Sequence, residues 1–359
     1  MIDRIHVPDT ETYIILHRQR ELQSLVSPNS FVLYPRLNTQ HAAVYGTSNM
    51  HPLALLPVLV AAVVRGHPAG AGTPAARFWE ETLPGTPMPD VITDLVQKGI
   101  DHSPLVEHYQ INLPNKDPKW TLRYGDPGSF ADKAEVPPGL FFNKAQVRVG
   151  GSMNVSFPPE LVPAILPRDV AGKVPFSNLT DVLSVFNMAP SSTAAAMVND
   201  TLSRCQAPNP AGEQKTCTTS LEATLQTAVR MLGAGSRTVW AVTSKIPAGG
   251  GLPLHPYVIE AVRTLDGDRH VGCHIVPFPY AVYQCHSTGQ PSAAYMVSLR
   301  GLREHGPGIA MAAICHLNTS SWNPAYPAFQ ILHTKPGGAP VCHFMRYANL
   351  LFGVKAGKA

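Results

Sequence analysis

The pattern of apolar and polar positions predicts helices in the middle of the chain and strands in its last third. Three segments within residues 176–235 carry apolar residues at helical spacing: FSNLTDVLSVF, SSTAAAMVNDTL and CTTSLEATLQTAVRMLGAG. Beyond them the pattern changes to short β-rich runs, most of them bounded by Pro or Gly: RTVWAV, YVIEAV, VGCHIV, YAVYQC, AAYMVSL, IAMAAICH, AFQILHT and PVCHFM. We therefore expect an α+β fold in which a helical part precedes a β-rich part.

Residues 217–235 give the clearest helical signal in the chain. Four apolar residues share one face of this segment: Leu221, Leu225, Val229 and Leu232. Thr219 and Glu222 stand three residues apart, which is the pattern of a capping box with Thr219 as the N-cap. Gly233 follows the last apolar position and is suited to end the helix. These signals predict both ends of the helix as well as its buried face.

The chain before residue 139 has a weaker pattern. Residues 1–49 show no convincing periodicity and carry no recognisable chemistry. Residues 73–138 are rich in Pro, Gly and Asp, and within them only PDVITDLVQ favours a helix. We interpret residues 73–138 as a linker arm with little core of its own, and we expect a compact domain over residues 139–354.

A segment that looks like a signal peptide lies at residues 50–72. Its apolar part, residues 53–64, has the length of a signal-peptide core, and the small residues at 69–71 suit a cleavage site. A buried helix is the alternative, although Pro57 disfavours a helix of either kind. We interpret Met50 as the true start of an exported protein and residues 1–49 as an upstream extension of the gene model.

Composition and charge narrow the range of partners. Charged residues make up 14% of the chain and the net charge is +4. A typical soluble domain has about 25% charged residues. No run of Lys or Arg forms a stripe that could follow a phosphate backbone, which argues against a nucleic-acid partner. No stretch reaches the roughly 18 apolar residues of a spanning helix, so no membrane span is expected.

Four of the six cysteines stand directly before a histidine. The pairs are Cys273-His274, Cys285-His286, Cys315-His316 and Cys342-His343, all on or beside predicted strands. Neighbouring residues of a strand point to opposite faces, so the sulfurs can gather on one side and the imidazoles on the other. In an oxidising compartment the sulfurs would form disulfides that staple the strands. The imidazoles would then make a metal site that the staples support from behind.

Several common roles of Cys and His compete with this hypothesis. A single Cys or His is more often structural, and a buried Cys commonly behaves as a small hydrophobe. Zinc fingers space their ligands by about two to five residues within each half-site, whereas here Cys and His are adjacent. With sulfur held in disulfides, imidazole nitrogen remains, which suits Cu(II), Zn or Ni, and copper binds most tightly. A blue-copper centre needs a free thiolate, so the pattern favours copper with nitrogen and oxygen donors.

These residues resemble the BURP domain, which defines a plant-specific family of secreted proteins. The family signature is four Cys-His pairs, and the gaps between them here are 10, 28 and 25 residues, with an insertion indicated near GLREHGPG. Further segments that resemble the family are FFNKAQVRVGGSMNVSFPP, LPRDVAGKVPFS, GEQKTCTTSLE, CHLNTSSWNPAYPAFQIL and PVCHF. Upstream, ARFWEETLPGTPMPDVITDL resembles the segment that follows the signal peptide in this family, which supports a start at Met50.

The resemblance implies a chemistry, because some members are copper-dependent cyclases that oxidatively join a Trp or Tyr side chain to another atom of a ribosomally made peptide. The copper ligands that it implies are His274, His286, His316 and His343. The staples that it implies are Cys273, Cys285, Cys315 and Cys342, with a separate local disulfide between Cys205 and Cys217. Self-cyclising members carry a core peptide before the domain, and QINLPNKDPKW at residues 110–120 has the wrong spacing for one. A separate precursor peptide is therefore the expected substrate.

Secretion brings expectations about location and modification. The protein is expected outside the cell, in the apoplast or cell wall, with the vacuole as the alternative. Sequons, which permit N-glycosylation but also arise often by chance, occur at four asparagines: Asn154, Asn178, Asn199 and Asn318. Asn318 stands where relatives commonly carry Asp, and a glycan there would lie beside His316.

Two other functions stay open beside the cyclase. The first is a non-catalytic protein of the cell wall, seed or stress response, in which the Cys-His framework is structural and the partner is a cell-wall component. The missing core peptide and the lack of a nucleophile–base motif or paired carboxylates in the sequence favour it. The second is a subunit that modulates a wall polysaccharide enzyme, although the Phe-x-x-Tyr repeats of that branch of the family are missing here.

Overall fold

The computed structural model describes residues 72–102, 136–157, 162–209, 212–247, 251–287, 289–302 and 308–355. The chain divides into two units, residues 1–63 and 64–359, and every described residue lies in the second unit. The predicted upstream extension, nearly all of the signal-peptide-like segment and residues 103–135 of the predicted arm lie outside the described residues. The domain boundaries drawn there stay predictions.

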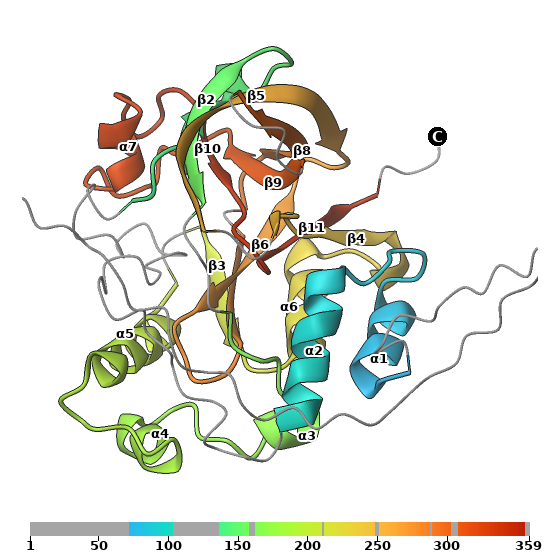
Figure 1. Ribbon diagram of the computed structural model, residues 1–359, viewed down its shortest axis with the longest axis vertical. Coiled ribbons are helices and arrows are strands. Elements are labelled where there is room, and N and C mark those ends of the chain that lie inside the picture. Colours follow the sequence, from blue (N-terminus) through green and yellow to red (C-terminus); the bar gives the residue numbers. More distant parts are fainter. Residues whose placement is uncertain are drawn as a thin grey trace, which may run out of the picture. The chain divides into compact units, whose positions relative to one another are not determined.

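The helices that the sequence predicts in the middle of the chain are present. The described helices are α1 (Pro74–Thr82), α2 (Asp90–His102), α3 (Arg168–Ala171), α4 (Leu179–Val185), α5 (Thr193–Gln206), α6 (Leu221–Leu232) and α7 (Pro327–Ile331), with short 3-10 turns at Lys144–Gln146 and Ser236–Thr238. Helix α6 buries Leu221, Leu225 and Leu232, and Gly233 ends it in the left-handed conformation with φ 59°. Residues of α1, α2 and α6 share one apolar core, and Figure 1 shows these helices below β4 and β11.

The described strands form two antiparallel sheets (Figure 1). The six-stranded sheet has the order β1 (Phe141–Asn143), β10 (Val341–Phe344), β9 (Ile309–His316), β8 (Ser292–Gly301), β5 (Leu252–Leu265) and β2 (Ser152–Phe157). The five-stranded sheet has the order β3 (Gln214–Thr218), β7 (Val282–Ser287), β6 (His270–Val276), β11 (Leu350–Val354) and β4 (Val239–Val242). Because most helices precede this β-rich part, the predicted α+β class is confirmed.

The two sheets bury different faces in different cores. The face of the five-stranded sheet that carries Cys273 and Cys285 packs against apolar residues of α1, α2 and α6. The face of the six-stranded sheet that carries Cys315 and Cys342 packs in a second core, to which α7 contributes. The opposite faces meet through an apolar layer: Trp240, Leu265, Ala294, Ala312, Ile314, Met345 and Leu351. Since side chains alternate along a strand, the histidine after each Cys is directed to the space between the sheets.

The segment AFQILHT, which was predicted to be a strand, contains helix α7 instead. Pro327 begins this helix, where its missing N–H costs no hydrogen bond and its fixed φ suits the first turn. Ala328, Phe329 and Leu332 then fall on one side of the turn and pack on the core of the six-stranded sheet. An apolar run of this length fits a strand or a short helix equally well, and the proline decides between them.

The linker interpretation of residues 73–138 is wrong for residues 74–102. Trp79, Leu83 and Ile92 are at most 1% exposed and belong to the core that contains α6. The prolines at 84, 87 and 89, which suggested an open arm, lie between α1 and α2 and separate the two helices. Two short amphipathic helices therefore complete the helical layer over the five-stranded sheet.

Helix α6 begins one residue later than the capping-box pattern predicted. Ser220 is the N-cap, and its hydroxyl accepts a hydrogen bond from the backbone N–H of Ala223 at 3.2 Å. Glu222 is consequently the second helical residue and makes no capping box with Thr219. Ser is preferred over Thr as an N-cap, and a start at Leu221 places that side chain, 1% exposed, in the core.

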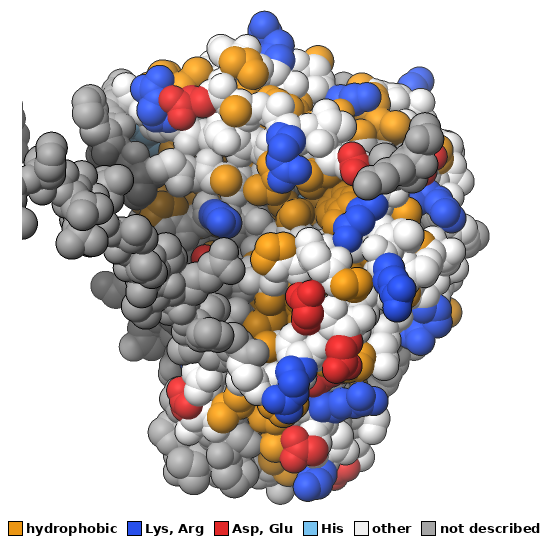
Figure 2. Space-filling view, turned by 90° about the vertical axis from the view of Figure 1, so that its right-hand side faces the viewer, with side chains coloured by type: hydrophobic (Ala, Val, Ile, Leu, Met, Phe, Trp, Pro, Cys, Tyr) orange, Lys and Arg blue, Asp and Glu red, His pale blue; other side chains and the backbone are white. Residues whose placement is uncertain are grey.

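Two features of the described residues bear on membranes and surface charge. No helix of the described residues is both long and apolar enough to cross a membrane. On the face drawn in Figure 2, Lys and Arg side chains lie scattered, several of them next to Asp or Glu. That face carries no continuous basic stripe of the kind that follows a nucleic-acid backbone.

Candidate metal centre

The four Cys-His pairs lie on two pairs of adjacent strands. The antiparallel register aligns Cys273 of β6 with Cys285 of β7, and Cys315 of β9 with Cys342 of β10. A disulfide joins the two cysteines in each case. A third disulfide joins Cys205, near the end of α5, to Cys217 on β3. The described residues therefore hold all six cysteines as disulfides, and sulfur is not available as a ligand.

The four histidines converge in the space between the two sheets. His274 and His286 form the β6/β7 pair, and their Nε2 atoms lie 3.2 Å apart. His316 and His343 form the β9/β10 pair, and their Nε2 atoms lie 3.4 Å apart. Between the pairs, the ring centroids of His274 and His343 are 5.7 Å apart, and those of His286 and His316 are 6.3 Å apart. The imidazoles thus form a ring of four in which each strand pair supplies two neighbours.

Burial favours the neutral, metal-binding form of three of the four imidazoles. His274, His316 and His343 are 1%, 3% and 6% exposed. Desolvation, followed by repulsion from the neighbouring histidines, lowers the pKa of His274 and of His316 well below the ordinary value. Desolvation also lowers the pKa of His343 to about 4, against a weaker opposing effect of the hydrogen bond to the Phe344 carbonyl. A neutral imidazole has a lone pair to offer a metal ion at neutral pH.

Residues outside the Cys-His pairs hold several of the rings. Nδ1 of His286 lies 3.1 Å from Oε1 of Glu213, whose side chain is 9% exposed. Nδ1 of His343 lies 3.3 Å from the carbonyl oxygen of Phe344. A ring that donates its Nδ1–H in this way leaves the Nε2 lone pair free toward the centre. Glu213 and the Phe344 carbonyl therefore prepare one Nε2 donor on each sheet.

The Nδ1 atoms of the other two rings, His274 and His316, have different surroundings. Asn349 accepts a hydrogen bond from the Ile275 N–H through Oδ1 at 3.0 Å, so its Nδ2 faces Nδ1 of His274 at 3.2 Å. This arrangement puts the proton of a neutral His274 on Nε2, and metal binding there requires the Asn349 amide to turn over. Nδ1 of His316 is buried without a hydrogen-bond partner among the described residues.

Each histidine pair has a spacing at which its two nitrogen atoms could bind one metal ion. Among the described residues, no group of three or more His, Cys, Asp or Glu side chains is arranged as it stands to hold an ion. Two nitrogen ligands about 2.0 Å from one ion at a tetrahedral angle would lie about 3.3 Å apart. The Nε2 separations of 3.2 and 3.4 Å match this spacing in both pairs, and in the metal-free protein they are the lengths of hydrogen bonds between the two rings. All-nitrogen donors of this kind suit copper, zinc or nickel.

Three further residues shape the space around the histidines, and the sequence patterns did not identify them. Gly272 lies beside the β6/β7 pair, and a Cβ there would lie 3.1 Å from Nε2 of His274. Gln284 is fully buried, and neither its side-chain nitrogen nor its oxygen has a partner among the described residues. Beside the β9/β10 pair, the Trp322 ring packs edge-on against His316 with centroids 4.9 Å apart. Gly272 and Gln284 stand two residues before a Cys-His histidine, so strand alternation could have revealed them.

The predicted glycosylation sites all lie at the surface of the described residues. Asn154, Asn178, Asn199 and Asn318 are exposed. Asn178 caps α4 by accepting a hydrogen bond from the Thr180 N–H at 2.9 Å, and the Asn318 amide donates to Gln290 at 3.3 Å. Exposure permits a glycan at each of the four positions.

The sequence of this chain is similar to that of known proteins. The model of the BURP domain matches residues 140–354. Protein RAFTIN 1B of Triticum aestivum is 34% identical over 353 residues, covering 84% of this chain and 96% of the relative. Protein RAFTIN 1A of the same species is 44% identical over 218 residues, and BURP domain-containing protein 13 of Oryza sativa subsp. japonica is 42% identical over 219 residues. The chain covers 55% and 52% of these two relatives, about half of their length.

Proposed function

The chain belongs to the BURP-domain family of plant proteins, and from this premise we propose that it is a secreted copper-binding protein that oxidatively cyclises a peptide. The proposed ligands are the four histidines of the Cys-His pairs: His274, His286, His316 and His343. The proposed substrate is a ribosomal peptide supplied as a separate precursor. The predicted location is the apoplast or cell wall, in keeping with three disulfides, which persist in oxidising compartments.

One observation carries the proposal: the four imidazoles converge between two sheets, with a disulfide behind each pair. The β6/β7 and β9/β10 pairs each bring two Nε2 atoms to the spacing that one ion would need. The lowered pKa values of His274, His316 and His343 keep these donors neutral. The disulfides fix the strand register, so that the rings cannot slide apart along the strands.

Copper and a few residues around the histidines would share the tasks of this chemistry. Bound copper would supply one-electron oxidation, and joining a Trp or Tyr side chain to a second peptide atom releases two electrons and two protons to dioxygen, giving hydrogen peroxide. Glu213 holds the His286 proton on Nδ1, and the Phe344 carbonyl does the same for His343. An apolar layer lies between the same two sheets, and three of the four rings are at most 6% exposed, so water has little access to them.

A second function is favoured by the depth of the histidines. Three of the four imidazoles are at most 6% exposed, which suits a metal that braces the two sheets in a non-catalytic protein of the cell wall. In that case copper binding would raise stability, and a peptide would not be converted.

Metal analysis and electron paramagnetic resonance of the secreted protein test the proposal. We expect bound copper with nitrogen ligands, and its loss in the double variant His286→Ala with His343→Ala, which removes the prepared donor of each sheet. The control is His333→Asn, because His333 is exposed and Asn tolerates its positive φ of 51°. Copper-free protein would overturn the metal assignment.

Turnover is measured separately, on the copper-loaded protein in air with candidate precursor peptides. The expected product has lost two hydrogens by mass spectrometry, and the double variant forms none. Copper binding without any such product would leave the non-catalytic function in place of the cyclase.

A further inference from the structure

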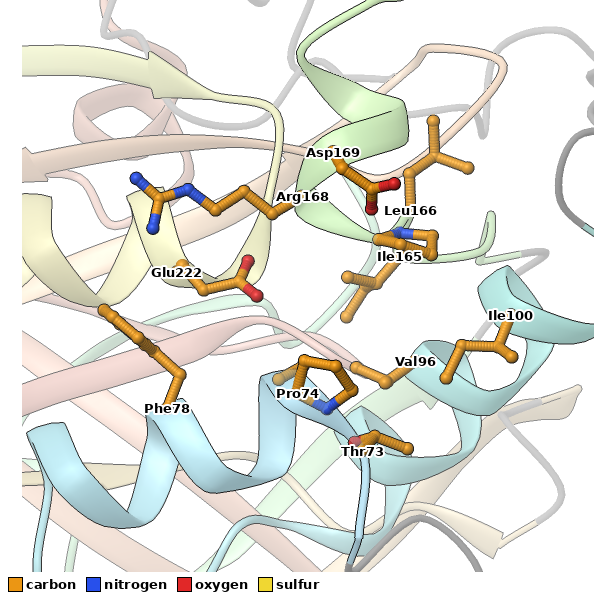
Figure 3. A pocket seen from close by; sticks show the side chains of 12 residues that line it. Thr73, Pro74, Phe78, Val96, Ile100, Ile165, Leu166, Arg168, Asp169 and Glu222 are labelled. Atoms are coloured by element: carbon orange, nitrogen blue, oxygen red, sulfur yellow. The ribbon is translucent and has the colours of Figure 1, made fainter.

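A cavity lies on the helical side of the five-stranded sheet, where the sheet carries Cys273 and Cys285 rather than the histidines. It has a volume of about 760 Å³, and among the described residues it is lined by α1, α2, the first turn of α6 and residues 165–169 (Figure 3). Its volume is in the range of roughly 300–1,000 Å³ that small-molecule sites occupy. The predicted metal chemistry does not use this cavity.

The walls of the cavity are mainly apolar. Phe78 comes from α1, Val96 and Ile100 come from α2, and Ile165 and Leu166 come from the segment before α3. Figure 3 shows these side chains arranged around a common space, with Pro74 below it. Such walls would contact a hydrocarbon or aromatic body and release water from it.

Glu222 is the polar feature of this cavity. Its side chain is 6% exposed, and no hydrogen bond or ion pair joins its carboxylate to another described residue. In Figure 3 the carboxylate is directed into the space between Ile165 and Pro74. Because Ser220 caps α6, the carboxylate has no capping task, although the positive end of the helix dipole favours a negative charge there. Because Glu222 lines the cavity, a cation or a hydrogen-bond donor that enters the cavity can reach its carboxylate.

The remaining charges favour a cation over an anion. Arg168 and Asp169 line the cavity as well, and both are exposed. Figure 3 shows the Arg168 side chain extending above Glu222, and no ion pair joins the two. With Glu222, the lining therefore carries two carboxylates and one guanidinium, which leaves a net negative charge.

We propose that this cavity binds a small amphipathic amine, with its apolar body against α1 and α2 and its ammonium group on Glu222. The same chemistry occurs on a lysine side chain of a peptide, and the experiment separates the two sources. The site is independent of copper, so its test and the test of the proposed function cannot fail for the same reason.

Calorimetric titration of the full chain with 2-phenylethylamine, in a chelator, tests this site. The neutral analogue 2-phenylethanol is the matched ligand, and we expect the amine to bind at least tenfold more tightly because its ammonium group makes a charge-assisted hydrogen bond. Glu222→Gln should abolish that difference while the alcohol binds as before. The control Asp181→Asn removes an exposed carboxylate in the first turn of α4 and should change neither affinity.

Two more variants test the apolar walls and the guanidinium of the cavity. Ile100→Trp, at a position 38% exposed, should fill the mouth of the cavity without unfolding the protein and weaken both ligands. Arg168→Ala should tighten amine binding, because it removes a like charge from the lining. If Arg168→Ala instead lowers thermal stability and neither it nor Glu222→Gln changes amine binding, Glu222 serves a structural ion pair and the proposal is wrong. Binding of an acetylated Phe-Lys amide without binding of the free amine would overturn it as well.

Discussion

The β6/β7 and β9/β10 histidine pairs have the same motif but different supports. Both follow a cross-strand disulfide, and their Nε2 separations differ by only 0.2 Å, 3.2 against 3.4 Å. In the β6/β7 pair, side chains contact both Nδ1 atoms, from Glu213 and Asn349. In the β9/β10 pair, a backbone carbonyl contacts one Nδ1 atom, and the other has no partner among the described residues. The dipeptide therefore sets the backbone and the face, while distant residues set the orientation of the rings.

Among the changes that test the two histidine pairs, removing the disulfides behind them should have the largest effect on stability. The Cys273–Cys285 and Cys315–Cys342 bridges span 12 and 27 residues. We expect replacement of Cys273 and Cys285 by Ala to lower the free energy of unfolding by about 3 kcal/mol. Replacement of Cys315 and Cys342 should lower it by about 0.7 kcal/mol more, because opening the longer loop gives the unfolded chain more entropy. Denaturant unfolding measures both values.

The Cys205–Cys217 bridge is the matched control, since it also spans 12 residues but does not flank a histidine pair. Its removal by Ala should cost about as much stability as removal of Cys273–Cys285. Copper affinity should fall only when a bridge behind a histidine pair is lost. An equal loss of copper from all three variants would show that the staples act on global stability alone.

Acid should destabilise the metal-free protein through the buried imidazoles. The pKa of His343 falls from 6.5 to about 4 on folding, so below pH 6.5 the unfolded chain takes up a proton that the folded chain does not. The contribution of His343 to the free energy of unfolding is fully present above pH 6.5 and is lost as the pH falls toward 4. Between pH 7 and pH 5 the loss from His343 is about 2 kcal/mol. The lowered pKa values of His316 and His274 act in the same direction, so both histidines of the β9/β10 pair contribute and His274 adds to the loss from the β6/β7 pair.

Urea unfolding in a chelator at both pH values measures this loss. The variant His343→Gln should lose about 2 kcal/mol less than the wild type between pH 7 and pH 5, since it has no proton to gain. His316→Gln should reduce the loss in the same sense. Identical pH slopes in all three proteins would contradict the assignment to the β9/β10 pair.

The site was predictable where it depends on neighbours in the sequence and not where it depends on distant contacts. Strand alternation sends Cys and His to opposite faces, and this follows from the dipeptide alone. Glu213 lies 73 residues before His286, and Asn349 lies 75 residues after His274, so no local pattern links them to the rings. In the same way, the helical pattern located α6, but its tertiary packing chose Ser220 over Thr219 as the cap.

Removing the carboxylate behind His286 should weaken copper binding without unfolding the protein. Glu213→Gln keeps the size of the side chain and removes the charge that makes the ring a better donor, so we expect about a tenfold loss of copper affinity by competitive titration. Glu260→Gln is the control, because its carboxylate pairs with Arg300 on the surface. The β9/β10 pair has no equivalent carboxylate among the described residues. Unchanged affinity in Glu213→Gln would mean that the two pairs bind copper independently of their supports.

The smallest expected effect comes from crowding one pair and leaving the other untouched. In Gly272→Ala the new Cβ would lie 3.1 Å from Nε2 of His274, so that ring must shift by a few tenths of an ångström, whereas the distance of 3.5 Å to Nε2 of His286 is an ordinary van der Waals contact. We expect copper affinity to fall a few-fold and the nitrogen hyperfine pattern in electron paramagnetic resonance to change. Gly235→Ala is the control, because a Cβ there meets nothing within 4 Å and the φ of −66° suits Ala. A spectrum that Gly272→Ala leaves unchanged would place the copper on the β9/β10 pair, and the better-supported histidines would then be structural.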